Sequence, residues 1–103
     1  MPLTSKERAE LRAEAHHLTA MVHVGHHGAD ERVTGALDDA LRTHELVKIQ
    51  LNRTAEESAR DMANRFAREL RADVVQVIGR TATLYRHNPE LERKKGDLPP
   101  WRK

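Results

Sequence analysis

The sequence predicts an α/β fold of two layers, in which helices pack on a four-stranded mixed sheet. Segments with apolar residues at helical spacing alternate with short segments rich in β-branched residues, in the order αβαβαββ. The helical segments are apolar on one side only, and the segment at 45–51 alternates apolar and polar residues. These patterns predict a parallel strand pair, one closing antiparallel hairpin, and a sheet face left open to solvent.

Composition restricts the class of protein. With 103 residues, we expect one domain at 1–86 and a flexible tail at 87–103 that contains 3 prolines. The domain holds 13 basic and 13 acidic residues, whereas the tail holds 5 basic and 3 acidic ones, so the net charge of +2 lies in the tail. Since cysteine is absent and no run approaches the ~20 apolar residues of a membrane span, we expect a cytoplasmic protein without membrane contact.

The first helix is expected to begin at a capping box, Thr4-Ser5-Lys6-Glu7, in which the side chains of Thr4 and Glu7 each accept a backbone N–H. It should run to about residue 17 with its charged residues in solvent. Its apolar face contains Leu11, Ala15 and Leu18. The short apolar run at 20–24 then predicts the first strand.

The second helix is expected at 30–44, because five apolar residues recur there at helical spacing. These are Val33, Ala36, Leu37, Ala40 and Leu41. The strand at 45–51 follows. A second capping box, Thr54-Ala55-Glu56-Glu57, predicts the start of the third helix, whose outer face carries arginines.

Two strands, at 74–78 and 81–85, close the predicted domain. Between them lie only Gly79 and Arg80, and glycine at the first of two loop positions is typical of a type II′ hairpin turn. The sequence therefore predicts that these strands pair with each other as an antiparallel hairpin.

The turn Gly25-His26-His27-Gly28 joins the first strand to the second helix. Two glycines allow close backbone approach, and the first N–H groups of a helix lack intrahelical partners and attract anions. The turn therefore suggests a phosphate-binding site, although a strand-to-helix turn also uses glycine for its geometry alone. Asp30 and Glu31 weaken the phosphate interpretation because they repel an anion.

Other kinds of site are not predicted. The turn lacks the third glycine of a dinucleotide-binding fingerprint and the Gly-Lys-Ser/Thr of a Walker loop. Clustered histidines raise the question of a metal, but they divide among three predicted elements, so we predict no metal and no cofactor. The cluster consists of His16, His17, His23, His26 and His27. We also predict no enzymatic activity, since neither a cysteine nucleophile nor a glycine elbow around a serine occurs.

Several segments, taken in order, resemble the YhbY-type CRM domain, the domain of chloroplast RNA splicing and ribosome maturation. The resemblance covers about residues 3–86. Its matching pieces are Ala15-His16 with Leu18, Val22 with Val24, Gly25-His26-His27-Gly28, His44-Glu45-Leu46-Val47-Lys48-Ile49, Val75-Gln76-Val77-Ile78-Gly79-Arg80 and Leu84-Tyr85-Arg86. The family fold is similar to the C-terminal domain of translation initiation factor three. Its Gly-x-x-Gly loop is likened to that of KH domains, which place the loop between two helices rather than after a strand.

The resemblance implies a small RNA-binding protein that associates with ribosomal RNA in precursors of the large subunit, and we expect a monomer. RNA contacts are then expected at the Gly-x-x-Gly loop and at basic residues near the open sheet face. The expected contact residues are Gly25, His26, His27, Gly28, Lys48, Arg80 and Arg86. The alternative is a protein–protein adaptor that uses the open sheet face or the tail.

Overall fold

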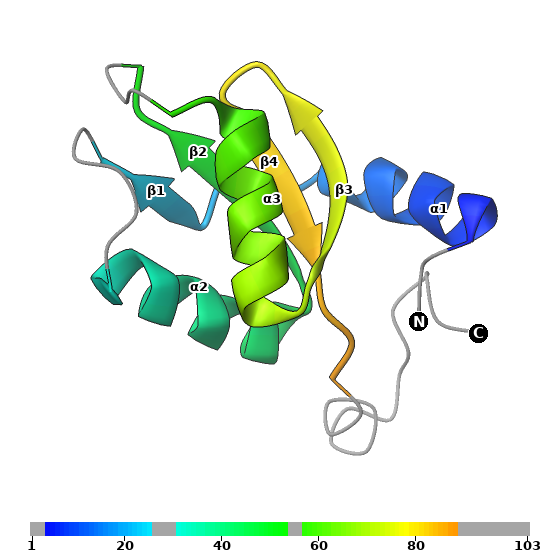
Figure 1. Ribbon diagram of the computed structural model, residues 1–103. Helices are drawn as coiled ribbons and strands as arrows, with labels where there is room; N and C mark the ends of the chain where they lie inside the picture. Colours follow the sequence, from blue (N-terminus) through cyan, green and yellow to red (C-terminus); the bar gives the residue numbers. More distant parts are fainter. Residues whose placement is uncertain (1–3, 26–30, 54–56, 89–103) are drawn as a thin grey trace.

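The computed structural model describes residues 4–25, 31–53 and 57–88 (Figure 1). Three helices and four strands follow one another in the predicted order αβαβαββ. Their bounds are α1 Ser5–Ala15, β1 Val22–Val24, α2 Glu31–His44, β2 Leu46–Leu51, α3 Ala59–Leu70, β3 Asp73–Ile78 and β4 Thr81–Tyr85. The predicted turn residues His26, His27 and Gly28 lie outside the described residues, as do residues 89–103 of the predicted tail.

The strands form one four-stranded sheet in the order β1-β2-β4-β3. β1 pairs with β2 in parallel, and β4 runs antiparallel to both β2 and β3. Since β2 and β3 both oppose β4, they run in the same direction with β4 between them. The predicted fold class, an α/β fold with a mixed four-stranded sheet, is therefore confirmed.

The main core lies between one face of the sheet and the helices α2 and α3, of which α2 contacts β1 and β2 and α3 contacts β3 and β4. Each helix turns its apolar side inward, as the spacing predicts. The fully buried side chains of this core include Leu37, Leu41, Ile49, Phe66 and Leu84. Burial of each such side chain stabilises the fold by about 1.5–3 kcal/mol.

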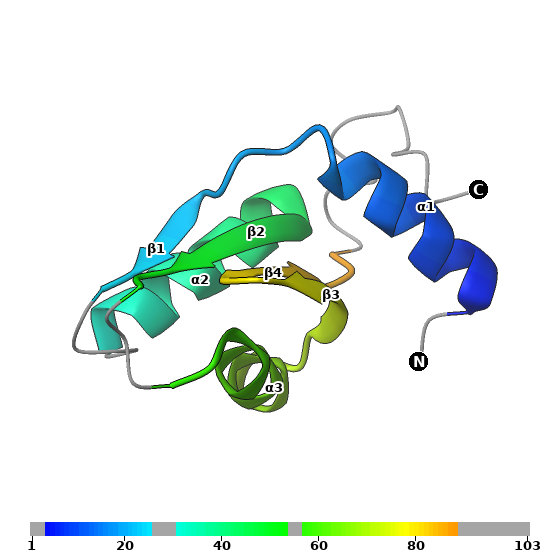
Figure 2. The same cartoon turned by 90° about the horizontal axis from the view of Figure 1, so that it is seen from above.

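The opposite face is not fully open, because α1 packs on one end of it (Figure 2). Leu11 of α1 is buried against Leu46, Val75 and Tyr85, whose side chains emerge on the side away from the main core. The prediction of a sheet face open to solvent is therefore wrong for the end that α1 covers. It applies only to the part of this face that α1 leaves uncovered. Leu46 directly precedes Val47 of the main core, so successive residues of β2 serve opposite faces.

A β-bulge in β3 lies where this strand contacts α1. Val74 pairs with Leu84 and Gln76 with Thr83, so Val75 is the additional residue. The bulge interrupts the ladder beside the carbonyl oxygen of Val74, which accepts a hydrogen bond of 2.7 Å from Nη1 of Arg8 on α1. The prediction that the charged residues of the first helix all lie in solvent is therefore wrong for Arg8.

One predicted capping box is confirmed, whereas Thr54, Ala55 and Glu56 of the other lie outside the described residues. Thr4 Oγ1 accepts from the Glu7 N–H at 3.1 Å, and Glu7 Oε1 accepts from the Thr4 N–H at 2.9 Å. The backbone and side-chain hydrogen bonds from Thr4 lower the pKa of the Glu7 carboxyl. The third helix begins at Ala59 instead of near Thr54, because the Ser58 hydroxyl is its cap and accepts from the Asp61 N–H at 3.1 Å.

The hairpin turn is confirmed. Ile78 pairs with Thr81 across a loop of two residues. Gly79 has φ +58°, whereas Arg80 is not among the residues with positive φ. A positive φ at the first position alone is what a type II′ turn requires, and glycine adopts it without strain.

The chain after β4 is fastened to the end of α2. The Arg86 N–H donates to the Glu45 carbonyl at 2.9 Å, and the Asn88 N–H donates to Glu45 Oε2 at 2.6 Å. Asn88 Nδ2 also donates to the carbonyl of Arg42 at 2.8 Å. Residues 86–88 therefore pack on the folded domain.

Candidate nucleic-acid interface

Three turns meet at one edge of the sheet, where β1 and β2 end and the β3–β4 hairpin reverses (Figure 1). The Asn52 N–H donates to the Val24 carbonyl at 2.9 Å, and the Leu51 N–H donates to the Arg80 carbonyl at 2.8 Å. We call this region the turn edge. It consists of Gly25, Asn52, Arg53, Gly79 and Arg80. Since α2 and α3 follow β1 and β2 in the chain, both helices begin at this edge (Figure 1).

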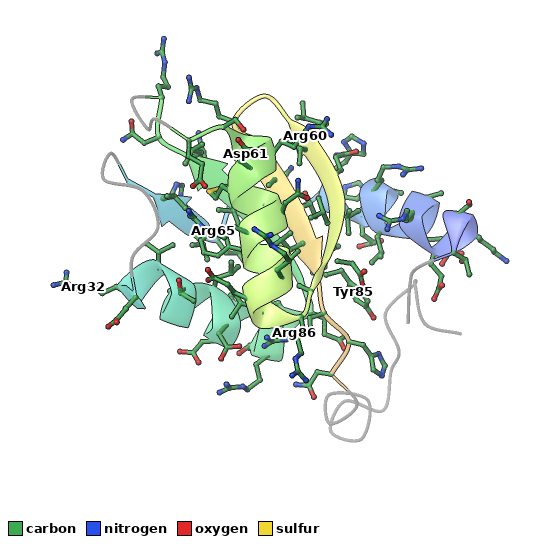
Figure 3. The ribbon with its side chains drawn as sticks, in the orientation of Figure 1. Arg32, Arg60, Asp61, Arg65, Tyr85 and Arg86 are labelled. Atoms are coloured by element: carbon green, nitrogen blue, oxygen red, sulfur yellow. The ribbon has the colours of Figure 1, made fainter. Side chains whose placement is uncertain are left out.

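Four exposed arginines lie within or beside the turn edge: Arg53 and Arg80 belong to it, and Arg32 and Arg60 stand in the first turns of α2 and α3. In Figure 3, Arg32 extends away from the start of α2, and Arg60 lies at the start of α3. None of the four forms an ion pair with another residue in the described ranges. The nearby acids Glu31 and Asp61 occupy the first turns of the helices. The arginine side chains are thus available to an anionic partner.

Arg80 is held in place by the segment that follows β2. Its Nη1 donates to the Asn52 carbonyl at 3.3 Å, which links the hairpin to the segment after β2. A guanidinium carries five N–H donors, so this bond leaves further donors for a phosphate. Of the predicted basic contact residues, Arg80 is the one that the structure places at the turn edge.

Gly25 directly follows β1 and is exposed. A Cβ atom built on Gly25 would have no neighbour within 4 Å, so the space above this backbone is open. Beside it lies a shallow pocket of about 360 Å³, lined by side chains of β1, β2 and the segment after β2. The polar residues of this lining are His23, Gln50, Asn52 and Arg53.

Lys48 lies on the partly open face, but its amine is engaged by α1. Nζ donates to the carbonyl oxygens of Ala15 at 3.0 Å and of Leu18 at 3.3 Å. These carbonyls belong to the end of α1 and the segment after it, where a positive charge is favourable. Lys48 therefore fastens α1 to the sheet, which gives it a structural role beside the predicted contact with RNA.

We expect Lys48→Met to lower the free energy of unfolding by about 1 kcal/mol, because the two hydrogen bonds to backbone carbonyls no longer form. Urea unfolding measures this change. Lys6→Met is the matched control: Lys6 is exposed at the start of the same helix and should give no measurable loss. An unchanged stability of Lys48→Met together with weaker RNA binding would instead show that the amine contacts RNA.

Arg86 lies at the opposite end of the sheet from Arg60 and the turn edge (Figure 3). Its Nη1 contacts Asp38 Oδ1 at 2.8 Å and the Leu70 carbonyl at 3.0 Å, and its Nη2 donates to the Asp38 carbonyl at 3.0 Å. The side chain is 21% exposed. The structure therefore does not bring Arg86 together with Gly25 and Arg80.

Sequence reasoning missed Arg53. It follows the end of β2 as the Gly-x-x-Gly turn follows the end of β1, and these two strands are parallel. The carboxyl ends of parallel strands meet at one edge of a sheet, and residues in the loops after them commonly form binding sites. That rule, applied to the predicted strand pair, would have selected Arg53.

Other site classes find no support within the described ranges. No group of three or more His, Asp or Glu side chains there could hold a metal ion. No described helix is long and apolar enough to cross a membrane.

Comparison with known proteins agrees with this architecture. A Bacillus subtilis protein named "Probable RNA-binding protein YqeI" is 35% identical over 97 residues, which cover 94% of this chain and 99% of the relative. "Probable RNA-binding protein PA4753" of Pseudomonas aeruginosa is 33% identical, covering 95% of this chain and 94% of the relative. The solution structure of protein SAV1595 from Staphylococcus aureus matches with a TM-score of 0.75 at 29% identity, covering 95% of this chain and 100% of that one.

The family model of the CRS1 / YhbY (CRM) domain matches residues 3–86, which include every helix and strand described above. The resemblance inferred from the sequence motifs covers the same span. The chain therefore belongs to the CRS1 / YhbY (CRM) domain family.

Proposed function

We propose that this protein binds RNA without catalysing a reaction, and that its target is ribosomal RNA in precursors of the large subunit. The observation that carries the proposal is the turn edge, where Gly25, Arg53 and Arg80 come together from three separate turns. Phosphate groups accept hydrogen bonds both from exposed backbone N–H groups and from guanidinium groups that form no ion pair. The names of the bacterial relatives support RNA as the partner.

The proposed contacts start from the Gly25-His26-His27-Gly28 turn and extend to Arg80 and Arg53. Gly25 leaves its backbone open to close approach. Arg53 and Arg80 provide positive charge at the same edge. The basic residues of the tail at 87–103 add further attraction that does not depend on RNA sequence.

Sedimentation of a cell lysate tests the ribosomal part of this proposal. The tagged protein should migrate with large-subunit precursors in a sucrose gradient, and RNase should return it to the top. Association that survives RNase would favour the alternative of a protein–protein adaptor. Migration as a free protein in both gradients would contradict ribosomal RNA as the target.

We expect Arg53→Ala and Arg80→Ala each to weaken binding to single-stranded RNA and to reduce the salt dependence. The slope of log K against log salt should become shallower by about 0.7 for each phosphate that the variant no longer neutralises. Fluorescence anisotropy at four or more salt concentrations measures it. Arg12→Ala removes the same charge from the exposed side of α1, far from the turn edge, and should leave the slope near its wild-type value.

A further inference from the structure

One row of side chains crosses the part of the sheet that α1 leaves uncovered. The strand register places His23 of β1 beside Gln50 of β2, Gln50 beside Thr81 of β4, and Thr81 beside Ile78 of β3. His23 faces away from the main core, because its neighbours Val22 and Val24 are the buried ones. We call these four residues the shelf. Four strands at ~4.8 Å spacing make it about 14 Å wide.

The shelf is exposed, whereas the middle of the next row toward α1 is covered. His23 and Gln50 are exposed, and Ile78 is 59% exposed although it is a large apolar residue. In the next row Thr83 is only 1% exposed, and Lys48 is bonded to the end of α1. Met21, whose N–H donates to the Lys48 carbonyl at the end of that row, is 38% exposed, so the sheet is covered in the middle of the row and open in the strip that borders the turn edge.

The chemistry of the shelf differs from that of the turn edge beside it. It offers an imidazole ring and an apolar side chain at its two ends, with a carboxamide and a hydroxyl between them. The pocket of about 360 Å³ lined by His23, Gln50 and Arg53 connects this strip to the arginines. An imidazole ring and an exposed apolar side chain, with hydrogen-bonding groups between them and positive charge beside them, suit a nucleobase whose phosphate lies over the arginines.

We propose that the RNA segment bound by this protein is unpaired, and that the shelf receives its bases while the turn edge holds its phosphates. This inference rests on the proposed RNA binding and specifies which RNA. Bases in an A-form duplex are stacked and paired, so their faces cannot reach His23 or Ile78. A duplex would contact the turn edge alone. The adjoining exposed arginines give the strip the charge complementarity expected for RNA rather than for an apolar protein surface.

The test compares three RNA probes: a twelve-nucleotide strand without self-pairing, the same strand with abasic riboses, and its blunt duplex. The wild type should bind the intact strand about tenfold more tightly than the abasic strand, as stacking on one side chain predicts. The double variant His23→Ala with Ile78→Ser should lose that preference and bind both strands equally. His17→Ala, an exposed histidine beyond α1, is the matched control and should keep it.

A second readout does not depend on affinity. The imidazole C–H resonances of His23 should move upfield when the intact strand is added, owing to the ring current of a stacked base, whereas those of His17 should not move. Equal binding of intact and abasic strands by the wild type, with an unshifted His23 resonance, would overturn the shelf and leave phosphate binding in place. Failure to bind any of the three probes would overturn the proposed function and the shelf with it.

Discussion

Gly25→Asp is expected to reduce RNA affinity by about a hundredfold or more, which corresponds to ~3 kcal/mol. The proposed phosphate contact uses the open backbone at the end of β1, where a Cβ atom would have no neighbour within 4 Å. An aspartate there fills the approach and places a carboxylate against phosphate. Both effects act on binding and neither removes an interaction within the domain.

The fold should survive this change. Gly25 is exposed, is not among the glycines with positive φ, and lies beside no atom that a side chain would displace. We therefore expect the free energy of unfolding to change by about 0.5 kcal/mol or less, the usual result for an exposed site without special geometry. Circular dichroism and urea unfolding check this, and anisotropy with single-stranded RNA measures the affinity.

Two further variants distinguish the electrostatic effect of Gly25→Asp from its steric effect. Gly35→Asp adds the same charge at an exposed glycine on the solvent side of α2, where a Cβ atom also meets nothing within 4 Å, and should have little effect on affinity. Gly25→Ala adds bulk without charge and should give an intermediate loss. If folded Gly25→Asp binds RNA as tightly as the wild type does, the Gly-x-x-Gly turn is not the contact site.

The fold was predictable from sequence where one local signal decided each element. Helical spacing placed α2 and α3, and Gly79 placed the hairpin. The end of α2 at His44 was predicted, but the left-handed residues that follow α2 and α3, Glu45 with φ 65° and Arg71 with φ 56°, were not. Glycine or asparagine usually marks such left-handed positions. Neither residue occurs there, so the sequence contained no signal for them.

The packing of α1 was not predictable for a different reason. Its contacts depend on the bulge at Val75, which turns that side chain toward Leu11, and on the reach of Arg8 to Val74. A bulge shifts the alternation of a strand by one residue, and alternation was the only signal available for the faces of β3. The hydrogen bond from Arg8 to the Val74 carbonyl joins residues far apart in the chain, and such a bond produces no local pattern in the sequence.

The candidate site was predicted in part. The structure places Gly25 and Arg80 at one edge, and it adds Arg53. Lys48 and Arg86 were selected because they are basic residues on or beside strands, yet their side chains bond within the domain. Sequence alone does not distinguish a cation that caps a helix or pairs with a carboxylate from one that faces solvent. Direct tests of RNA binding decide their role.

Arg86→Met is expected to lower the free energy of unfolding by about 2–4 kcal/mol. The guanidinium joins three parts of the fold: the segment after β4, Asp38 of α2, and the Leu70 carbonyl at the end of α3. Methionine keeps much of the side-chain volume but leaves the Asp38 carboxylate and the Leu70 carbonyl without this donor. Removing one partner of a partly buried, hydrogen-bonded ion pair costs more than the pair itself contributes. Urea unfolding at neutral pH measures the loss.

Arg42→Met is the matched control, because Arg42 also pairs with Asp38, at 2.8 Å, but with a side chain that is 63% exposed. An exposed pair of this kind contributes about 0.5 kcal/mol or less, so the two arginines should differ several-fold in their effect on stability. RNA affinity should be unchanged in both variants under conditions where each is folded, because neither arginine lies at the turn edge. A folded Arg86→Met protein of near wild-type stability that binds RNA weakly would show that Arg86 contacts RNA, and the interface would then extend to both ends of the sheet.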